Sequence, residues 1–187
     1  LKAEELVKDA MTKDGVPIVC LRPGTIFGPG GEVFTPMMGF SLGNKLFAVI
    51  GRGDFVLPLV YIDNLCEAIL SVINNDKGDG MIFNLVDTGN ITKKDYIEKL
   101  IKNLYPDSFV LYIPLEVFYM IVEIQEWLTG KVGRPPFLTK YRVKSSQNKI
   151  IYDSSNITKT LNWKPRLSIY DGIDAVLSFE KSKKNAL

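Results

Sequence analysis

The residues of this chain that are best suited to hold a ligand are glycines and prolines, which determine the backbone conformation. The segment from Arg22 to Gly31 contains four glycines and two prolines and directly follows a short apolar run, Pro17 to Leu21. Glycine and proline fix tight backbone conformations and allow a ligand to come close. In open α/β sheets, ligands bind at the carboxyl ends of the strands. The segment therefore predicts a ligand-binding turn at a sheet edge, although Gly28 to Gly31 taken alone also fits a plain loop.

Side chains that commonly carry acid–base or metal chemistry are scarce. The 187 residues include no histidine, which excludes histidine triads, histidine proton shuttles and histidine-ligated metal within them. We predict no metal site. Cys20 and Cys66 lie in apolar runs without C-x-x-C spacing, which predicts two buried, reduced thiols and a cytoplasmic protein. Asp63 follows an apolar run and is interpreted as a helix cap rather than a catalytic acid.

Composition limits the partners. With 46% hydrophobic residues the chain can bury one core in no more than two small lobes. Its 23 basic and 21 acidic residues are interspersed, so nucleic acid is not predicted as a partner. The longest apolar stretch, Ile113 to Ile124, is interrupted by Glu116 and Glu123, and no membrane span is predicted.

Periodicity predicts alternating helices and strands. Residues 1–14 are predicted to form a helix that places Ala3, Leu6, Val7 and Ala10 on one face, with charges opposite, and ends at Gly15. Because the chain begins inside this helix, we expect a longer protein. Pro17 to Leu21 is typical of a strand buried on both faces of a parallel sheet. Further elements are expected as follows: a helix at 35–42, strands at 47–50, 60–62, 81–86 and 109–113, a helix from Pro114 to about Leu128, and another helical stretch from Pro135 and Pro136.

Cap signals predict where three helices begin. Asp63 is expected to cap a helix whose buried side chains are Leu65, Ala68, Ile69, Val72 and Ile73. Thr92 and Asp95 resemble a capping box before a helix that buries Ile97, Leu100, Ile101 and Leu104. Ser168 with Asp171 repeats the signal before a last helix that buries Ile173, Val176 and Leu177.

Four segments in order resemble the extended short-chain dehydrogenase family, also called the NAD-dependent epimerase/dehydratase family. Lys2 to Leu6 resembles the continuation of the family's catalytic helix, and Leu21 to Gly30 is close to its R-P-x-x-x-Y-G-P strand end. Leu59 to Leu65 is similar to V-H/Y-V-D-D-V. Phe83 to Val86, together with Leu161 to Pro165, resembles the family's last strand and its closing L-G-W-x-P.

The resemblance implies an NAD(P)-dependent oxidoreductase in which a tyrosine is the general acid/base and hydride moves to or from the nicotinamide. Its Y-x-x-x-K lysine would stand one position before Leu1, and its glycine-rich pyrophosphate turn would lie further upstream. The chain would then be the C-terminal half of the protein and inactive by itself. By resemblance, Pro23, Gly24 and Ile26 would contact the nicotinamide carboxamide, and Thr25 would face the substrate. Arg22 is expected to form a structural ion pair with Glu4 or Glu5.

The substrate class follows from departures from the family pattern. Nucleotide-sugar members usually carry asparagine where this chain has Thr25, and an Arg-Asp pair where it has Leu57 and Pro58. Without that guanidinium the main diphosphate clamp is lost, unless Arg52 or Arg134 replaces it. Arg52, Leu57 and Arg134 are therefore predicted, with Thr25, to contact the substrate. Together with the lid described next, these departures favour a secondary alcohol or ketone on a hydrophobic, steroid-like or dihydroflavonol-like substrate.

An apolar lid supplies the second indication of a hydrophobic substrate. Its side chains are Phe118, Tyr119, Met120, Ile121 and Val122 in one helix, followed by Phe137 and Leu138. Core packing is the favoured interpretation; an apolar pocket or a membrane-facing entry is the alternative.

The expected fold is therefore α/β: the C-terminal part of a Rossmann-like, doubly wound parallel sheet plus a small mixed α/β substrate lobe. Residues 1–31, with 60–90 returning, are assigned to the dinucleotide domain, and residues 32–59 and 91–187 to the substrate lobe. The expected partners are NAD or NADP, a small-molecule substrate, the missing N-terminal half and a second copy in a homodimer. A nucleotide-sugar epimerase or dehydratase and a non-catalytic dinucleotide sensor remain as alternatives.

Overall fold

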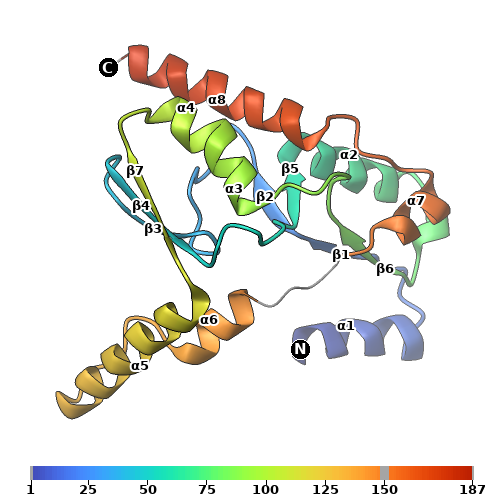
Figure 1. The fold of residues 1–187 in the computed structure, drawn as a ribbon. Coiled ribbons are helices and arrows are strands. Elements are labelled where there is room, and N and C mark those ends of the chain that lie inside the picture. Colours follow the sequence, from blue (N-terminus) through green and yellow to red (C-terminus); the bar gives the residue numbers. More distant parts are fainter. Residues whose placement is uncertain (1, 148–151, 187) are drawn as a thin grey trace. The chain divides into compact units, whose positions relative to one another are not determined.

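The computed structural model describes residues 2–147 and 152–186, which form two units (Figure 1). The first unit comprises the described residues within Leu1–Pro29, Pro58–Gly89 and Ile151–Ala175. The second comprises those within Gly30–Leu57, Asn90–Ile150 and Val176–Leu187. Residues 152–175, predicted to belong to the substrate lobe, group with the first unit because Ile157, Leu161 and Trp163 join its core.

The first unit contains two parallel strand pairs. Its elements are α1 (Lys2–Lys13), β1 (Cys20–Pro23), β2 (Thr25–Phe27), β5 (Leu59–Tyr61), α2 (Ile62–Ile73), the short helix η1 (Asp76–Gly78), β6 (Ile82–Leu85), α7 (Ser155–Leu161) and the start of α8 (Ile169–Asn185). β1 pairs with β6 and β2 pairs with β5, both in parallel. The buried core lies between these strands and α2 and α7, and consists of Val60, Leu65, Ala68, Phe83, Leu85, Ile157, Leu161 and Trp163. Trp163, in the loop after α7, is 5% exposed within this core.

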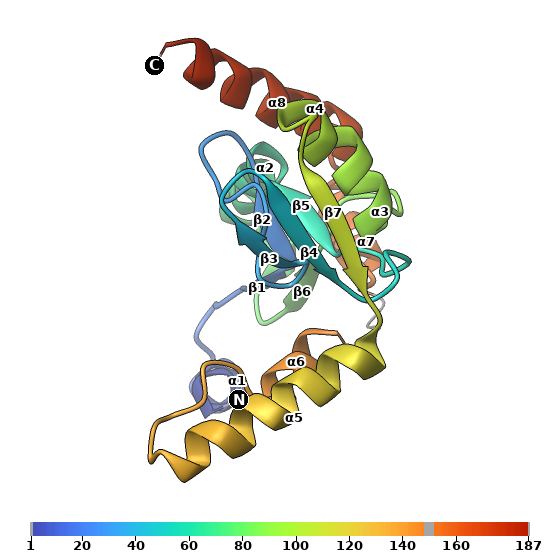
Figure 2. The ribbon, with the colours of Figure 1, turned by 60° about the vertical axis from the view of Figure 1, so that its left-hand side comes forward.

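The second unit is built on a mixed sheet of three strands (Figure 2). Its elements are β3 (Gly39–Leu42), β4 (Leu46–Ile50), α3 (Lys93–Tyr96), η2 (Ile97–Ile101), α4 (Lys102–Leu104), β7 (Phe109–Ile113), α5 (Leu115–Lys131), α6 (Lys140–Ser146) and the rest of α8. β4 is central, antiparallel to β3 and parallel to β7. The predicted helix at 35–42 is wrong, because Gly39 pairs with Val49 and begins β3. A side chain on Gly39 would lie 1.9 Å from the Ala48 carbonyl oxygen, so this close pairing needs glycine.

The helical segment from Lys93 to Leu104 confirms a capping prediction. The Thr92 hydroxyl accepts a hydrogen bond from the Asp95 N–H, and the Asp95 carboxylate accepts one from the Thr92 N–H. The four side chains predicted to face inward, Ile97, Leu100, Ile101 and Leu104, are all buried. The same reciprocal bonds join Ser168 and Asp171 before α8, as predicted.

The beginning of α2 corrects another prediction. Tyr61, not Asp63, occupies the position before the helix, and its side chain forms no cap; Asp63 lies within the first turn. Leu65 and Ala68 are buried as predicted, whereas Ile69 and Ile73 are 41% and 70% exposed. The buried stripe is narrower than the pattern indicated because fully buried Asn64 occupies part of it.

Several expectations about burial at the amino-terminal end are also wrong. α1 buries no residue, and Leu6 is 71% exposed. β1 begins at Cys20, later than the predicted run 17–21, and its last two residues are exposed. Cys20 and Cys66 are free thiols as predicted, but Cys66 is exposed on α2 and Cys20 is only half-buried.

α5 and α6 pack side by side as a helical pair at the end of β7 (Figures 1 and 2). α6 begins at Lys140, after the two prolines, because Thr139 caps it by accepting a hydrogen bond from the Arg142 N–H. Phe118 and Val122 are buried as the core interpretation predicted, but Met120 and Ile121 are 54% and 49% exposed. Among the described residues, no helix is both long and apolar enough to cross a membrane.

Candidate functional site

The glycine-containing segment forms a ledge where two strand pairs diverge. We define the ledge as Pro23, Gly24, Thr25 and Ile26. Up to Pro23 the chain runs beside β6, and from Thr25 it runs beside β5. Gly24 donates its N–H to the Leu85 carbonyl at 2.8 Å, and Thr25 donates its N–H to the Pro58 carbonyl at 2.7 Å. The ledge thus lies at the carboxyl end of β1 and β6, which is where open α/β sheets bind ligands.

Gly24 permits this change of partner because it has no side chain. A β-carbon there would lie 2.3 Å from the Pro58 carbonyl oxygen and 2.8 Å from a methyl carbon of Val86. We expected glycine here to let the backbone approach a ligand. The structure shows instead that the missing side chain makes room for neighbouring protein, so Gly24 fixes the shape of the ledge.

The ledge presents an apolar surface. Pro23 is exposed, and Ile26, although it lies within β2, is 48% exposed. Thr25 is half-buried between them. An exposed proline and isoleucine on a backbone held by two strand partners suit a flat ring, which needs apolar contact and a fixed approach. Contact of Pro23, Gly24 and Ile26 with a cofactor, and of Thr25 with a substrate, remains a prediction.

Asp87 lies at the same sheet edge and was not identified from the sequence. It follows β6, is 6% exposed, and its Oδ2 accepts the Tyr61 N–H at 2.8 Å. Burial raises the pKa of this carboxyl group, against the hydrogen bonds from the Tyr61 backbone and the Asn64 side chain. Its other oxygen, Oδ1, is buried without a partner among the described residues. Asp87 thus fixes the backbone of Tyr61, the residue that precedes α2.

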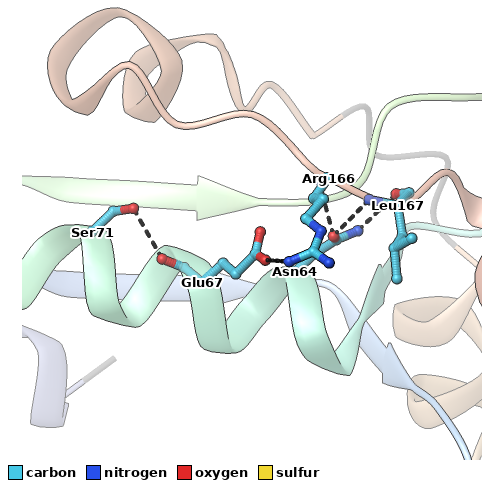
Figure 3. A network of polar contacts seen from close by, with 5 residues as sticks. All are labelled: Asn64, Glu67, Ser71, Arg166 and Leu167. Carbon is cyan, nitrogen blue, oxygen red and sulfur yellow. Dashed lines mark hydrogen bonds and ion pairs between the residues drawn. The ribbon is translucent and has the colours of Figure 1, made fainter.

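A buried amide fixes the loop that leads into α8 (Figure 3). The Asn64 side chain accepts hydrogen bonds from the N–H groups of Arg166 and Leu167, both at 3.1 Å, and donates one to the Leu167 carbonyl at 2.9 Å. The Arg166 guanidinium also reaches the Glu67 carboxylate at 3.2 Å. These contacts set the start of α8, where Gly172 packs against the rings of Phe27 and Tyr61.

Arg22 forms the ion pair expected from the sequence. Its guanidinium binds the Glu4 carboxylate, which also lies 3.2 Å from the Lys8 ammonium. The Arg22 hydrogen bond, with a smaller contribution from Lys8, holds the pKa of Glu4 below its usual value. Arg22 therefore links α1 to β1, and its guanidinium contacts Glu4.

We accordingly expect Arg22→Ala to leave both the melting temperature and the affinity for NAD(P)H unchanged, because an exposed ion pair contributes little to stability. Thermal melting and a fluorescence titration with NADH and NADPH test this, with Glu4→Gln as the matched variant that breaks the same pair. A fall in cofactor affinity in Arg22→Ala but not in Glu4→Gln would show that Arg22 contacts the ligand.

The second unit contains a cavity of about 280 Å³. Arg52, predicted to contact substrate, lines it, together with the acidic side chains Asp54 and Glu116. The remaining lining residues are Ile50, Gly51, Phe55, Leu115 and Gln147. Apolar walls with a few charged groups of both signs are typical of small-molecule sites.

A buried lysine stands behind this cavity. Lys93 is fully buried, and its Nζ donates to the Ile50 carbonyl at 2.9 Å and to the Gln147 side-chain oxygen at 2.6 Å. Burial lowers the pKa of Lys93 from 10.5 to about 8, and the Asp54 carboxylate opposes this effect. The ammonium group also lies 4.9 Å from the centre of the Phe55 ring. Both acceptors of Lys93 line the cavity, so this amine fixes part of its wall.

Two further residues predicted to contact substrate lie elsewhere in the second unit. Leu57 is 3% exposed and is used in packing. Arg134 is exposed in the turn after α5, where its N–H donates to the Thr129 carbonyl, and it is not among the residues that line the cavity. Of these three residues, only Arg52 thus lines the cavity.

Comparison with known proteins agrees with the resemblance. A sequence profile of the NAD dependent epimerase/dehydratase family matches residues 1–85. The sterol-4-alpha-carboxylate 3-dehydrogenase of Candida albicans is 26% identical over 95% of this chain and 53% of its own length. A 3beta-hydroxysteroid-dehydrogenase/decarboxylase of Arabidopsis thaliana is 25% identical over 92% of this chain and 33% of its own length. The chain therefore spans between a third and about half of these relatives.

A solved structure shows the same fold. The UDP-glucuronic acid 4-epimerase from Bacillus cereus, in complex with UDP-glucuronic acid and NAD, superimposes with a TM-score of 0.64 at 18% identity. The match covers 96% of this chain and 50% of the epimerase. The α/β, Rossmann-like fold class predicted from the sequence is confirmed.

Proposed function

We propose that this chain, whose residues 1–85 match the NAD dependent epimerase/dehydratase family, forms part of an NAD(P)-dependent oxidoreductase and that its ledge lies against the nicotinamide ring. One observation supports this proposal above the others: at Gly24 the chain leaves β6 for β5, and an exposed proline and isoleucine remain at the carboxyl edge of a parallel sheet. When bound, the cofactor supplies the hydride acceptor or donor. The chain itself supplies a fixed apolar surface that orients a ring.

Further residues of the same polypeptide complete the site in this proposal. The 187 residues contain neither a tyrosine followed four residues later by lysine nor a G-x-x-G-x-x-G sequence. The family's acid–base pair and pyrophosphate turn would therefore be supplied by a segment N-terminal to this chain, and residues 1–187 alone would show no turnover. The relatives support this proposal because the chain spans only part of their length.

The substrate we propose is a secondary alcohol or ketone on a hydrophobic, sterol-like skeleton, bound by the second unit. Leu57 and Pro58 stand where nucleotide-sugar members have an arginine and an aspartate, and Leu57 is buried. The two curated relatives are named for sterol and steroid substrates. Arg52 and Arg134 would then contribute less to substrate binding than the apolar side chains do.

A nucleotide-sugar epimerase or dehydratase is the second candidate. It is favoured by Arg52, because a guanidinium at a cavity wall can bind a diphosphate with two hydrogen bonds. A protein that binds the dinucleotide without turnover is the third.

Ligand-induced stabilisation of the complete polypeptide separates these candidates. We expect NAD or NADP to raise the melting temperature, and a 3β-hydroxysterol, but not UDP-glucose or UDP-glucuronic acid, to raise it further. The absorbance of NAD(P)H then reports turnover of the ligand that binds. In Arg52→Leu, sterol binding should persist; for a diphosphate ligand, that substitution would weaken binding by about tenfold or more. Stabilisation by a UDP-sugar alone would contradict the sterol proposal, and cofactor binding without turnover of any of these ligands would favour the sensor.

A further inference from the structure

The α5–α6 pair exposes an apolar surface. Along α5, exposed apolar side chains recur at the three- and four-residue spacing of one helix face. They are Val117, Met120, Ile121, Ile124, Trp127 and Leu128, each between 40% and 60% exposed. Five of the six are large aliphatic side chains, which rarely gather on the surface of a monomer unless the surface binds something.

Three aromatic rings extend this surface at its carboxyl end. Trp127 is 60% exposed, Phe137 in the loop before α6 is 80% exposed, and Tyr141 in the first turn of α6 is 81% exposed. The loop is held against α5, because the Leu138 N–H donates to the Gln125 side chain at 3.0 Å and the Lys140 N–H donates to Glu126 at 3.1 Å. These rings are therefore presented by an ordered hairpin (Figures 1 and 2).

Basic groups outnumber acidic ones around the rings, where Glu123 and Glu126 are acidic neighbours on α5. Between Trp127 and Gln147 the sequence has five basic residues and no acidic one. Lys131 lies over the Trp127 ring, 3.6 Å from its centre, and Lys140 pairs with Glu123. The other three, Arg134, Arg142 and Lys144, are exposed and form no ion pair with a described residue. Apolar side chains, tryptophan and tyrosine rings and unpaired basic groups thus occupy one end of the hairpin.

We propose that the carboxyl half of α5, the following loop and α6 form a surface that binds the face of an anionic lipid bilayer. Tryptophan and tyrosine combine an apolar ring with a polar group and favour the boundary between acyl chains and water. Arginine and lysine favour anionic headgroups, and one apolar helix face suits insertion parallel to the membrane. Charge complementarity favours this partner, because Arg134, Arg142 and Lys144 form no ion pair with a described residue and anionic headgroups can supply the opposite charge. The proposal does not depend on the proposed enzymatic function.

Vesicle binding by the complete polypeptide tests the proposal. We expect sedimentation with vesicles of phosphatidylcholine and phosphatidylserine but not of phosphatidylcholine alone, and release by high salt, which screens exposed charges. Tryptophan emission should shift to shorter wavelength with the anionic vesicles, and Trp127→Phe should remove most of that shift, because the other tryptophan of this chain, Trp163, is buried.

Two variants with matched controls separate charge from apolar contact. Arg134→Glu with Arg142→Glu and Lys144→Glu should lower vesicle affinity at least about tenfold. Lys45→Glu with Lys181→Glu and Lys183→Glu makes the same change in net charge at exposed positions outside the surface and should not lower it as far. Trp127→Ala with Phe137→Ala and Tyr141→Ala should also abolish binding, whereas Phe109→Ala, which removes an exposed ring on β7, should not.

Three results would overturn the proposal. The first is equal binding to neutral and anionic vesicles, and the second is an unchanged affinity in the Arg134, Arg142 and Lys144 variant. The third is a concentration-dependent dimer in analytical ultracentrifugation that the aromatic variant dissociates, since this would assign the surface to a second copy of the chain. Because melting in the presence of cofactor is measured separately, none of these outcomes bears on the proposed oxidoreductase activity.

Discussion

Gly24→Ala is expected to destabilise the complete polypeptide by about 3 kcal/mol and to remove cofactor binding, because the site has no room for one more carbon. The new β-carbon would lie 2.3 Å from the Pro58 carbonyl oxygen, which is backbone and bonded to the Thr25 N–H. Relief requires β2 and β5 to move apart, which distorts the ledge itself. Urea denaturation measures the loss of stability, and an NADH titration below the unfolding range measures binding.

Gly130→Ala is the matched control. Gly130 lies within α5, where an added β-carbon would meet no atom within 4 Å, and the variant should gain up to about 1 kcal/mol from the higher helix propensity of alanine. Val86→Ala should not rescue Gly24→Ala, because the closest contact is the Pro58 backbone and not the Val86 side chain. Stability of Gly24→Ala equal to that of the wild type would refute the close approach on which the shape of the ledge depends.

Lys93→Met is expected to abolish a rise in stability that we predict for the wild type between about pH 8 and pH 10.5. Burial lowers the pKa of Lys93 in the folded protein to about 8, against 10.5 as its ordinary value. Below pH 8 both the folded and unfolded states hold the proton. Between the two values only the unfolded state holds it, so the contribution of Lys93 to the free energy of unfolding rises with pH by a total of about 3 kcal/mol and then levels off.

At neutral pH the same substitution should not destabilise the protein and should stabilise it by up to about 3 kcal/mol, because methionine avoids burying a charge. The acceptors left behind, Ile50 and Gln147, line the cavity, where water can reach them. Urea denaturation over a pH series measures both effects. Lys94→Met is the control at the exposed neighbouring position, and the rise should persist in it. If Lys93→Met retained the rise, the buried amine would not be its source.

The sequence predicted best what depends on residues close together in the chain. The reciprocal bonds of Thr92 with Asp95 and of Ser168 with Asp171 each span three residues, and both pairs are found. An ion pair of Arg22 with Glu4 or Glu5 was also predicted, although these residues lie far apart in sequence, and the structure shows the pair with Glu4. The strands at 46–50, 59–61, 82–85 and 109–113 followed from apolar runs and lie close to the predicted limits.

What the sequence did not predict depends on distant partners. Lys93 is buried because acceptors 43 and 54 residues away, Ile50 and Gln147, meet its amine; by type alone a lysine in the first turn of a helix is expected to be exposed. Asp87 fixes the residue before α2 because β6 ends beside Tyr61, 26 residues away in sequence. The helix predicted at residues 39–42 is wrong because these residues form a strand through tertiary contacts. The close approach of Gly39 to Ala48 is one of them, and the local sequence pattern does not show it.

The candidate site was likewise predicted in part from the sequence, and the rest required the structure. The glycine- and proline-rich composition of residues 22–31 indicated a ligand-binding turn, but only the strand pairing shows why Gly24 must be glycine and which side chains remain exposed beside it. Arg52, Leu57 and Arg134 could not be ranked from the sequence, since their burial depends on how β4, α5 and the intervening loops pack.

The most direct test of the proposed ledge is a nuclear Overhauser measurement between the bound cofactor and the methyl group of Ile26. The complete polypeptide is prepared with labelled isoleucine δ1 methyl groups, and the Ile26 signal is assigned by its loss in Ile26→Val. Our account predicts cross-peaks from the nicotinamide ring protons to the Ile26 methyl group. Cross-peaks from that ring to isoleucines of the second unit, such as Ile50, with none to Ile26, would contradict it.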